Sequence, residues 1–302
     1  MAYDSKYRRG VSGKIIKVGS EKFLKKAGQN ILVVGRPKTG TTVVSKTIQN
    51  SLPNASYFLE PPKEKFFLSP LDTTDNKYNV VKILYGQYSR NTLKKIVNNE
   101  FPLKFDKIIF IIRDPRDEFI SYLMYWPFSF IKNVPNLNMS KLKEWQNLIM
   151  QKEKDPKSIS AIELNNKVQE IRGSNFLQNQ VPAIKEYYQF LKQLPQNSFI
   201  LKYEEFIMFN TKELEKYLGF RLIGKRDVGN LKRTHRTGSF NNWKSFFTQQ
   251  DLNYFRDTLK GEMLQAGYTD VELVPQEQLN PQVYSKYLEN LLKEALGARR
   301  HQ

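Results

Sequence analysis

The stretch ILVVGRPKTGTTVVSKTI, residues 31–48, decides the fold of this chain. Its first four residues are apolar and predict a buried strand, and TTVVSKTI predicts a helix. Between them lies a loop bounded by Gly35 and Gly40. A glycine-rich turn between a strand and a helix presents backbone N–H groups and a helix N-terminus to an anion. The sequence therefore predicts a phosphate-binding loop in an α/β fold.

The lysine of this loop is not where a nucleotide-hydrolysing loop would have it. In the pattern GxxxxGK[ST], the lysine follows the second glycine and reaches the β- and γ-phosphates, and the Ser or Thr binds Mg²⁺. Here Thr41 and Thr42 follow Gly40, and the lysine is Lys38, inside the loop. The glycine spacing favours a phosphate cradle, whereas the position of Lys38 argues against ordinary ATP or GTP hydrolysis.

The composition is that of a folded protein with a strong positive charge. The 302 residues are 40% hydrophobic and 26% charged, which suits one α/β domain with insertions. The net charge of +18 favours a polyanion such as nucleic acid or a small, highly anionic ligand. Basic residues are spread along the chain without RGG or RS repeats, so we expect no specific nucleic-acid partner.

The sequence also bears on the compartment. The chain has no cysteine, which excludes disulfides and thiolate metal sites. No window approaches about 18 uncharged apolar residues, and the first residues, MAYDSKYRRGVSGK, lack the apolar segment of a signal peptide. We expect a soluble, cytoplasmic protein without a transmembrane segment.

Apolar, β-prone runs along the chain predict the strands of a sheet. They are residues 31–34, 56–59, 79–84, 107–112 and 198–203. Helical patterns separate these runs, and such alternation is typical of a parallel sheet. The predicted fold class is α/β, with a central parallel sheet of about five strands and helices on both faces.

Three parts are predicted along the chain. Residues 1–28 form a basic extension, residues 29–274 form the main domain, and residues 275–302 contain a helix with apolar residues at helical spacing. Within the main domain, residues 126–175 are polar and interrupted by prolines, which predicts a helical insertion over the ligand edge of the sheet. A substrate lid and a helical excursion without a role in binding are both open interpretations.

A second group of anion-binding side chains follows the fourth predicted strand. Arg113 stands where that strand ends, and Ser121 comes eight residues later on the next helix. The carboxyl ends of parallel strands face one crevice, so Arg113 should lie near Gly35. An arginine fork and a serine hydroxyl suit a second phosphate. The alternative is that Arg113 pairs with Asp114 or Asp117 and that Ser121 faces solvent.

Together these motifs resemble the sulfotransferases that use 3′-phosphoadenosine-5′-phosphosulfate (PAPS). The 5′-phosphosulfate loop of that family has the form PKSGTT, matched here by Pro37, Lys38, Thr39, Gly40, Thr41 and Thr42. Thr39 replaces the usual serine. The family's 3′-phosphate motif, an arginine at a strand end and a serine eight residues later, is matched by Arg113 and Ser121.

A third element near the C-terminus resembles the same family. RTGSFNNWKSFFT, residues 236–248, is similar to the family's RKGxxGDWKxxFT. Arg236 and Gly238 keep the family's residues, whereas Thr237 replaces a lysine and Asn241 replaces a glycine. The resemblance implies that Arg236, Thr237 and Gly238 help to bind the 3′-phosphate. The changed residues leave the detailed contacts of this backbone loop open.

The segment LKYEEF, residues 201–206, is similar to a strand end of the family that would bring Tyr203 near the adenine. The four similar elements fall in order over residues 31–248. The resemblance implies an enzyme that moves a sulfuryl group from PAPS to a hydroxyl acceptor.

This chemistry assigns roles to the loop residues. Transfer puts negative charge on the bridging oxygen as its bond to sulfur breaks, and a fixed cation stabilises that charge. Lys38 is the implied partner of this oxygen. Thr41 and Thr42 can donate to the 5′-phosphate, with Arg36 on the flank of the loop. No apolar strand ends in a Walker-B-type acid, and a sulfuryl group carries less charge than a phosphoryl group, so we expect no metal ion.

An acceptor hydroxyl also needs a base. The chain has two histidines, His235 and His301, and the second is the penultimate residue of the sequence. In the branch of the family that acts on small molecules in the cytosol, a histidine follows a Lys-Thr pair on a strand. The comparable position after Lys82 and Ile83 holds Leu84, so that base is missing.

Other branches, including those that act on carbohydrates, use a glutamate just after the second strand. FLEPP supplies Glu60 at that point, and a carboxylate there suits proton transfer. Glu60 is the base that the resemblance implies, with Glu64 and His235 as alternatives. Glu60 could instead pair with a nearby lysine such as Lys63.

We therefore expect a PAPS-dependent sulfotransferase, with a carbohydrate or glycoconjugate as the acceptor class. Two other interpretations stay open: a degenerate P-loop kinase or NTPase, and a non-catalytic module that binds polyanions. The aromatic run YLMYWPF, residues 122–128, could stack on an acceptor or pack in the core. Neither the acceptor nor the oligomeric state follows from the sequence.

Overall fold

The computed structural model describes most of the chain. The described residues are 7–9, 15–17, 28–133, 139–223, 226–234, 238–269 and 272–300. Near the N-terminus, β1 (Tyr7–Arg9) and β2 (Ile15–Lys17) pair antiparallel as a two-stranded sheet. The rest of the predicted N-terminal extension up to residue 27 lies outside the described residues.

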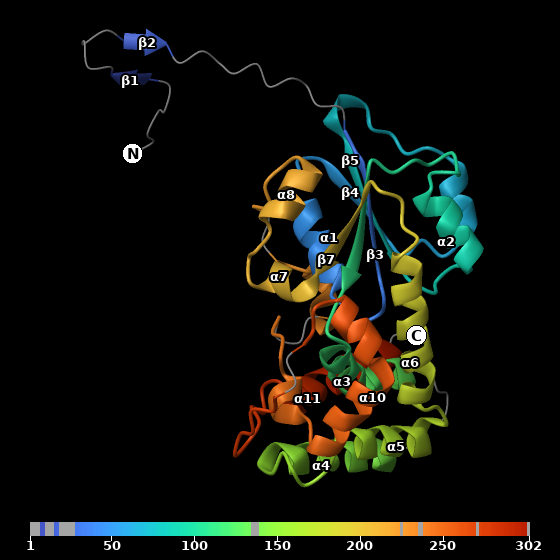
Figure 1. The fold of residues 1–302 in the computed structure, drawn as a ribbon, viewed down its shortest axis with the longest axis vertical. Helices are drawn as coiled ribbons and strands as arrows, with labels where there is room; N and C mark the ends of the chain where they lie inside the picture. Colours follow the sequence, from blue (N-terminus) through green and yellow to red (C-terminus); the bar gives the residue numbers. More distant parts are fainter. Residues whose placement is uncertain are drawn as a thin grey trace.

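A five-stranded parallel sheet forms the centre of the fold, with the strand order β4-β5-β3-β6-β7 (Figure 1). Its strands are β3 (Asn30–Gly35), β4 (Ala55–Leu59), β5 (Tyr78–Leu84), β6 (Lys107–Ile112) and β7 (Ser198–Lys202). Each coincides with a predicted strand to within about one residue at either end. The all-parallel pairing and the helices on both faces confirm the predicted α/β fold.

The central strand β3 shows why its sequence is apolar throughout. Ile31 and Val33 belong to a core on one face of the sheet, and Leu32 and Val34 belong to a larger core on the other. All four side chains are fully buried. A strand covered on both faces cannot alternate apolar with polar residues, so its run is continuous.

Helices pack on both faces of the sheet (Figure 1). On one face lie α1 (Thr41–Asn50), α7 (Tyr203–Ile207) and α8 (Lys212–Leu218), which contribute to the smaller core. On the other lie α2 (Arg90–Val97) and α6 (Phe176–Leu191), which contribute to the larger core. The central strand β3 is thus buried from both faces of the sheet.

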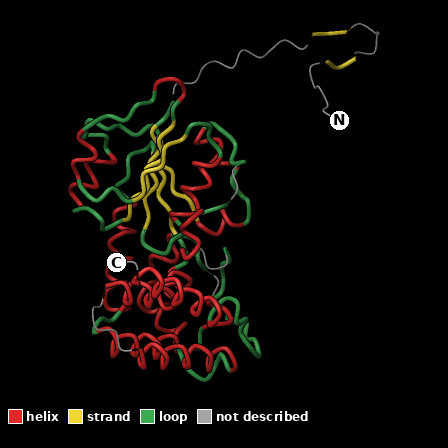
Figure 2. The backbone as a smooth tube through the Cα atoms, turned by 180° about the vertical axis from the view of Figure 1, so that it is seen from behind, coloured by secondary structure: helices red, strands yellow, loops and turns green. Residues whose placement is uncertain are grey.

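A layer of helices lies beyond the carboxyl end of the strands, as Figure 2 shows from behind. It comprises α3 (Pro115–Asn133), α4 (Met139–Lys154), α5 (Ala161–Arg172), α10 (Gln249–Gln265) and α11 (Ser285–Arg300). The other helices in the described part of the chain are η1 (Glu64–Leu68), η2 (Thr74–Asn76), η3 (Gly229–Thr234) and α9 (Trp243–Phe246). In the described part of the chain, no helix combines the length and the apolar character needed to cross a membrane.

The residues predicted as an insertion, 126–175, fold as the second half of α3 followed by α4 and α5. Trp126 and Trp145 are almost fully buried and meet edge to face, with ring centroids 5.4 Å apart. These helices share the larger core with the sheet. A role for this segment as a substrate lid stays a prediction.

Candidate active site

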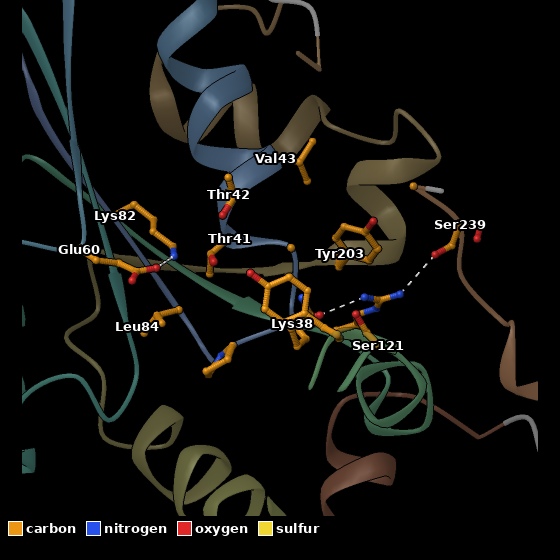
Figure 3. Close-up of a pocket in the computed structure, with 15 residues that line it drawn as sticks. Lys38, Thr41, Thr42, Val43, Glu60, Lys82, Leu84, Ser121, Tyr203 and Ser239 are labelled. Carbon is orange, nitrogen blue, oxygen red and sulfur yellow. Dashed lines mark hydrogen bonds and ion pairs between the residues drawn. The ribbon is translucent and has the colours of Figure 1, made fainter. Parts of the chain in front are cut away.

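A cavity of about 300 Å³ opens at the carboxyl edge of the sheet (Figure 3). Its walls come from the loop after β3, the start of α1, the ends of β4 and β5, one face of α3, and the residues Gly238 and Ser239. Parallel strands end at one edge of a sheet, so motifs that are far apart in the sequence meet there. The two predicted anion-binding motifs therefore share one cavity.

Two residues of the loop after β3 have left-handed backbone. Gly40 has φ 90° and Lys38 has φ 70°. A Cβ atom at Gly40 would lie 2.3 Å from the ring of Tyr203, so the position needs glycine for space as well as for conformation. From there α1 begins, with Thr41 and Thr42 lining the cavity at its N-terminus.

Two of the predicted binding residues, Arg36 and Thr39, form hydrogen bonds that stabilise the loop on the side away from the cavity. Arg36 is 3% exposed, and its guanidinium bonds to Glu118 at 3.0 Å and to Gln180 at 2.8 Å. Thr39 donates its hydroxyl to the Arg36 carbonyl at 2.7 Å. Neither side chain is among those that line the cavity, and a role for Arg36 on the flank of the loop in binding the donor stays a prediction. Burial raises the pKa of Glu118, against the attraction of Arg36.

Arg113 lines the cavity at the end opposite the Glu60–Lys82 pair, and one of its N–H donors has no hydrogen-bond partner among the described residues. Its guanidinium donates to the carbonyl of Lys38 at 2.9 Å and to that of Ser239 at 3.4 Å. It also stacks over the ring of Tyr203, 4.6 Å from the centroid. Its Nε atom is buried without a hydrogen-bond partner. A buried donor left unpaired beside a cavity indicates a place for a ligand acceptor, and Ser121 lines the same cavity.

The carboxylates near Arg113 have other partners. Asp114 pairs with Arg116, Oδ2 to Nη2 at 2.7 Å. Asp117 accepts the backbone N–H of Asn241 at 2.6 Å and that of Trp243 at 3.2 Å. The alternative in which Arg113 pairs with either aspartate is therefore wrong.

The third predicted element reaches the cavity through Gly238 and Ser239. Asn241, which replaces a glycine of the family pattern, has φ 59°. Asparagine tolerates the left-handed region better than most residues, so the loop keeps the backbone that glycine would give it. His235, Arg236 and Thr237 lie outside the described residues.

Glu60 and Lys82 form an ion pair where β4 and β5 end, as Figure 3 shows. The amide of Glu60, whose φ is 48°, donates to the carbonyl of Lys82 at 2.7 Å. The side chain of Lys82 is 4% exposed and that of Glu60 is 38% exposed. Burial lowers the pKa of Lys82, against the effect of the Glu60 charge. The alternative in which Glu60 pairs with a lysine is thus met by Lys82 of the neighbouring strand rather than by Lys63.

Lys82 is a cavity residue that sequence reasoning did not assign. The available signal was a lysine inside the otherwise apolar run of β5, where a charge needs a partner. Glu64, an alternative base, accepts a hydrogen bond from Thr92 at 3.1 Å and is not among the residues that line the cavity.

The aromatic run at 122–128 divides between the two expected roles. Trp126 is 2% exposed and packs in the core, whereas Tyr125 lines the cavity. The Nζ atom of Lys38 lies over the Tyr125 ring, 3.3 Å from its centroid. Tyr125 was not assigned from the sequence, because the periodicity of a helix does not show which of its aromatic residues meets a distant loop.

Residues 29–267 match the family model described as the sulfotransferase domain. Since the match spans most of the chain, this protein belongs to the sulfotransferase family. Among solved structures, the chain is similar to mouse sulfotransferase SULT7A1 complexed with PAP, with 15% sequence identity and a TM-score of 0.37. That similarity covers 87% of this chain and 97% of the mouse one. No curated protein sequence matches the chain.

Proposed function

We propose that this protein transfers the sulfuryl group of PAPS to a hydroxyl of a carbohydrate or glycoconjugate. The observation that carries this proposal is the shared cavity. It joins the Lys38 loop to Arg113, whose buried Nε has no partner. The donor has phosphate groups at two positions, and the cavity has anion-binding groups at both ends.

The described residues fit such a donor. Thr41 and Thr42 would bind the 5′-phosphate through hydroxyl and N–H groups at the start of α1. Arg113, Ser121 and the backbone at Gly238 would bind the 3′-phosphate. Tyr203 would contact the adenosine moiety beside Gly40. From outside the described residues, Arg236 and Thr237 complete the proposed set.

The groups at the Glu60 end support the chemistry. When bound, PAPS supplies the sulfuryl group, whose bond to the 5′-phosphate oxygen breaks as the acceptor oxygen bonds to sulfur. The ammonium groups of Lys38 and Lys82 would stabilise negative charge at this end of the cavity. The carboxylate of Glu60 would take the hydroxyl proton of the acceptor.

The acceptor class follows from the proposed base. The half-buried carboxylate of Glu60 can be reached by a substrate from solvent. Leu84 occupies the strand position where the small-molecule branch of the family has a histidine. Both features support a carbohydrate or glycoconjugate hydroxyl as the acceptor.

The first test measures binding without turnover. Adenosine 3′,5′-bisphosphate at about a hundred times its Kd, without Mg²⁺, should stabilise the wild type by about 2.7 kcal/mol. For a chain of this size we expect the melting temperature to rise by roughly 4 °C. Arg113→Ala should reduce the shift, because it removes the donors at one end of the cavity. A shift seen only with Mg-ATP would refute the proposal and favour a nucleotide-hydrolysing protein.

The second part of that test identifies the acceptor. Labelled PAPS should give labelled product with hydroxylated oligosaccharides. Product formed with phenols alone would contradict the carbohydrate assignment and leave sulfotransfer intact. Binding to heparin or DNA with no labelled product would instead favour a non-catalytic polyanion-binding module.

A further inference from the structure

The ammonium of Lys38 is held against an aromatic ring from a distant helix. Its Nζ atom lies 3.3 Å from the centroid of the Tyr125 ring. This is well inside the distance of about 6 Å at which a cation is attracted to an aromatic face. In Figure 3, Lys38 lies between the Glu60–Lys82 pair and Ser121.

Tyr125 is on a helix that can hold its ring in place. It follows Ser121 by four residues on α3, so the two side chains share one face of the helix, and both line the cavity. The neighbouring residues Met124 and Trp126 are buried in the larger core. The Tyr125 ring also contacts that of Phe128, with centroids 5.5 Å apart. The ring therefore projects from a firmly packed helix.

The backbone of Lys38 does not by itself fix its ammonium. The carbonyl of Lys38 accepts a hydrogen bond from Arg113 at 2.9 Å, which anchors the main chain. The charged group is still at the end of a flexible four-carbon stem. A carboxylate in the place of Tyr125 would fix the ammonium and also neutralise it. A ring face attracts the ammonium without cancelling its charge.

We propose that Tyr125 is a positioning residue that keeps the Lys38 ammonium in the cavity with its charge available to the reacting oxygen. This rests on the proposed sulfotransfer function, because the charge of Lys38 matters only if negative charge develops beside it. The ring face is the property that matters, and the hydroxyl of Tyr125 is not needed for this role.

Two substitutions separate the ring from the hydroxyl. Tyr125→Phe keeps the face and should keep kcat within about twofold of the wild type. Tyr125→Leu removes the face and should lower kcat about tenfold, equivalent to about 1.4 kcal/mol. Adenosine 3′,5′-bisphosphate should bind both variants within about twofold of the wild type, because Tyr125 acts on Lys38 rather than on the phosphates. A general packing defect would instead weaken binding and turnover together.

The proton chemical shift of the Lys38 ε-methylene can be measured without turnover. The resonance is assigned as the one that disappears in the Lys38→Arg variant. Ring shielding should move it upfield in the wild type and in Tyr125→Phe. An unshifted resonance in the wild type would overturn the contact, even if Tyr125→Leu failed to fold.

The kinetic outcomes are equally decisive. Equal kcat values in Tyr125→Leu and the wild type, or an equal loss in Tyr125→Phe and Tyr125→Leu, would overturn the role of the ring. A wild type that neither binds the bisphosphate nor transfers sulfate would overturn the proposed function itself, whatever the methylene resonance shows.

Discussion

At the scale of single residues, two proposed catalytic side chains stand on unusual backbone. Lys38 and Glu60 have φ values of 70° and 48°. A non-glycine residue in this region costs roughly 1–2 kcal/mol, so surrounding contacts must hold it there. For Lys38 that contact is the bond from Arg113 to its carbonyl, and for Glu60 it is the bond from its amide to the Lys82 carbonyl. These two hydrogen bonds hold the backbone of both residues in place, and with it the positions of their Cβ atoms.

The role of Glu60 can be tested against a matched neighbour. Glu60→Gln should lower kcat by at least about a hundredfold, because an amide cannot accept the acceptor's proton. The same change in Glu64 should leave kcat within about threefold, since that carboxylate bonds to Thr92 outside the cavity. Initial rates of labelled-sulfate transfer at saturating donor would measure both.

One control addresses the ion pair. Glu60→Gln also leaves the buried Lys82 without its carboxylate, so the melting temperature of each variant should be measured beside its rate. A larger loss in Glu64→Gln than in Glu60→Gln would move the base to Glu64. Full activity of both variants would leave His235 as the candidate.

At the scale of elements, α3 organises the loop at 238–242. Asp117, fully buried on the first turn of α3, binds the backbone N–H groups of Asn241 and Trp243. The Arg116 guanidinium stacks over the Trp243 ring, 3.6 Å from its centroid. The carbonyl of Ser239 is thereby placed near Arg113. One helix start thus supports both sides of the proposed 3′-phosphate site.

The backbone of Asn241 gives a prediction for this loop. Asn241→Gly should bind adenosine 3′,5′-bisphosphate within about twofold of the wild type, because glycine adopts positive φ freely. Asn241→Val should weaken binding by roughly five- to a hundredfold, because a β-branched residue strains this conformation by about 1–3 kcal/mol. Titration calorimetry would measure both Kd values. Equal affinities of the two variants would show that the loop does not depend on this backbone conformation.

At the scale of the whole molecule, buried charged side chains connect the helices that lie beyond the strands. Lys152 of α4 is fully buried and donates to the carbonyls of Pro156 at 2.7 Å and Ile159 at 2.6 Å. Asp251 of α10 is also fully buried and accepts the backbone N–H groups of Ala161 and Ile162, both at 2.9 Å. Burial lowers the pKa of Lys152 to about 8, against the attraction of Asp251.

This lowered pKa predicts a pH dependence of stability. Between about pH 8 and 10.5 the unfolded chain binds the Lys152 proton more strongly than the folded one, so the free energy of unfolding should rise with pH there. Lys152→Met should lack this contribution. The wild type should therefore gain up to about 3 kcal/mol relative to the variant across this window. Urea unfolding at several pH values would measure the difference, and parallel curves would contradict the prediction.

The sequence by itself determined the sheet and the anion loop, because both depend on signals that are local in the chain. Mainly apolar, β-prone runs marked all five parallel strands, and the glycines around Lys38 marked the turn between β3 and α1. The spacing of Arg113 and Ser121 was also visible, since a single strand end and the helix after it contain both. Such patterns need no knowledge of distant contacts.

Only the tertiary structure decided which distant groups meet. Lys82 pairs with Glu60 because β4 and β5 are neighbours in the sheet, and the guanidinium of Arg36 is buried against Glu118 of α3 rather than beside the cavity. Tyr125 reaches Lys38 because α3 lies beyond the carboxyl end of the strands (Figure 1). Charged and aromatic side chains choose partners through packing between segments that are remote in the sequence, and no local pattern records that choice.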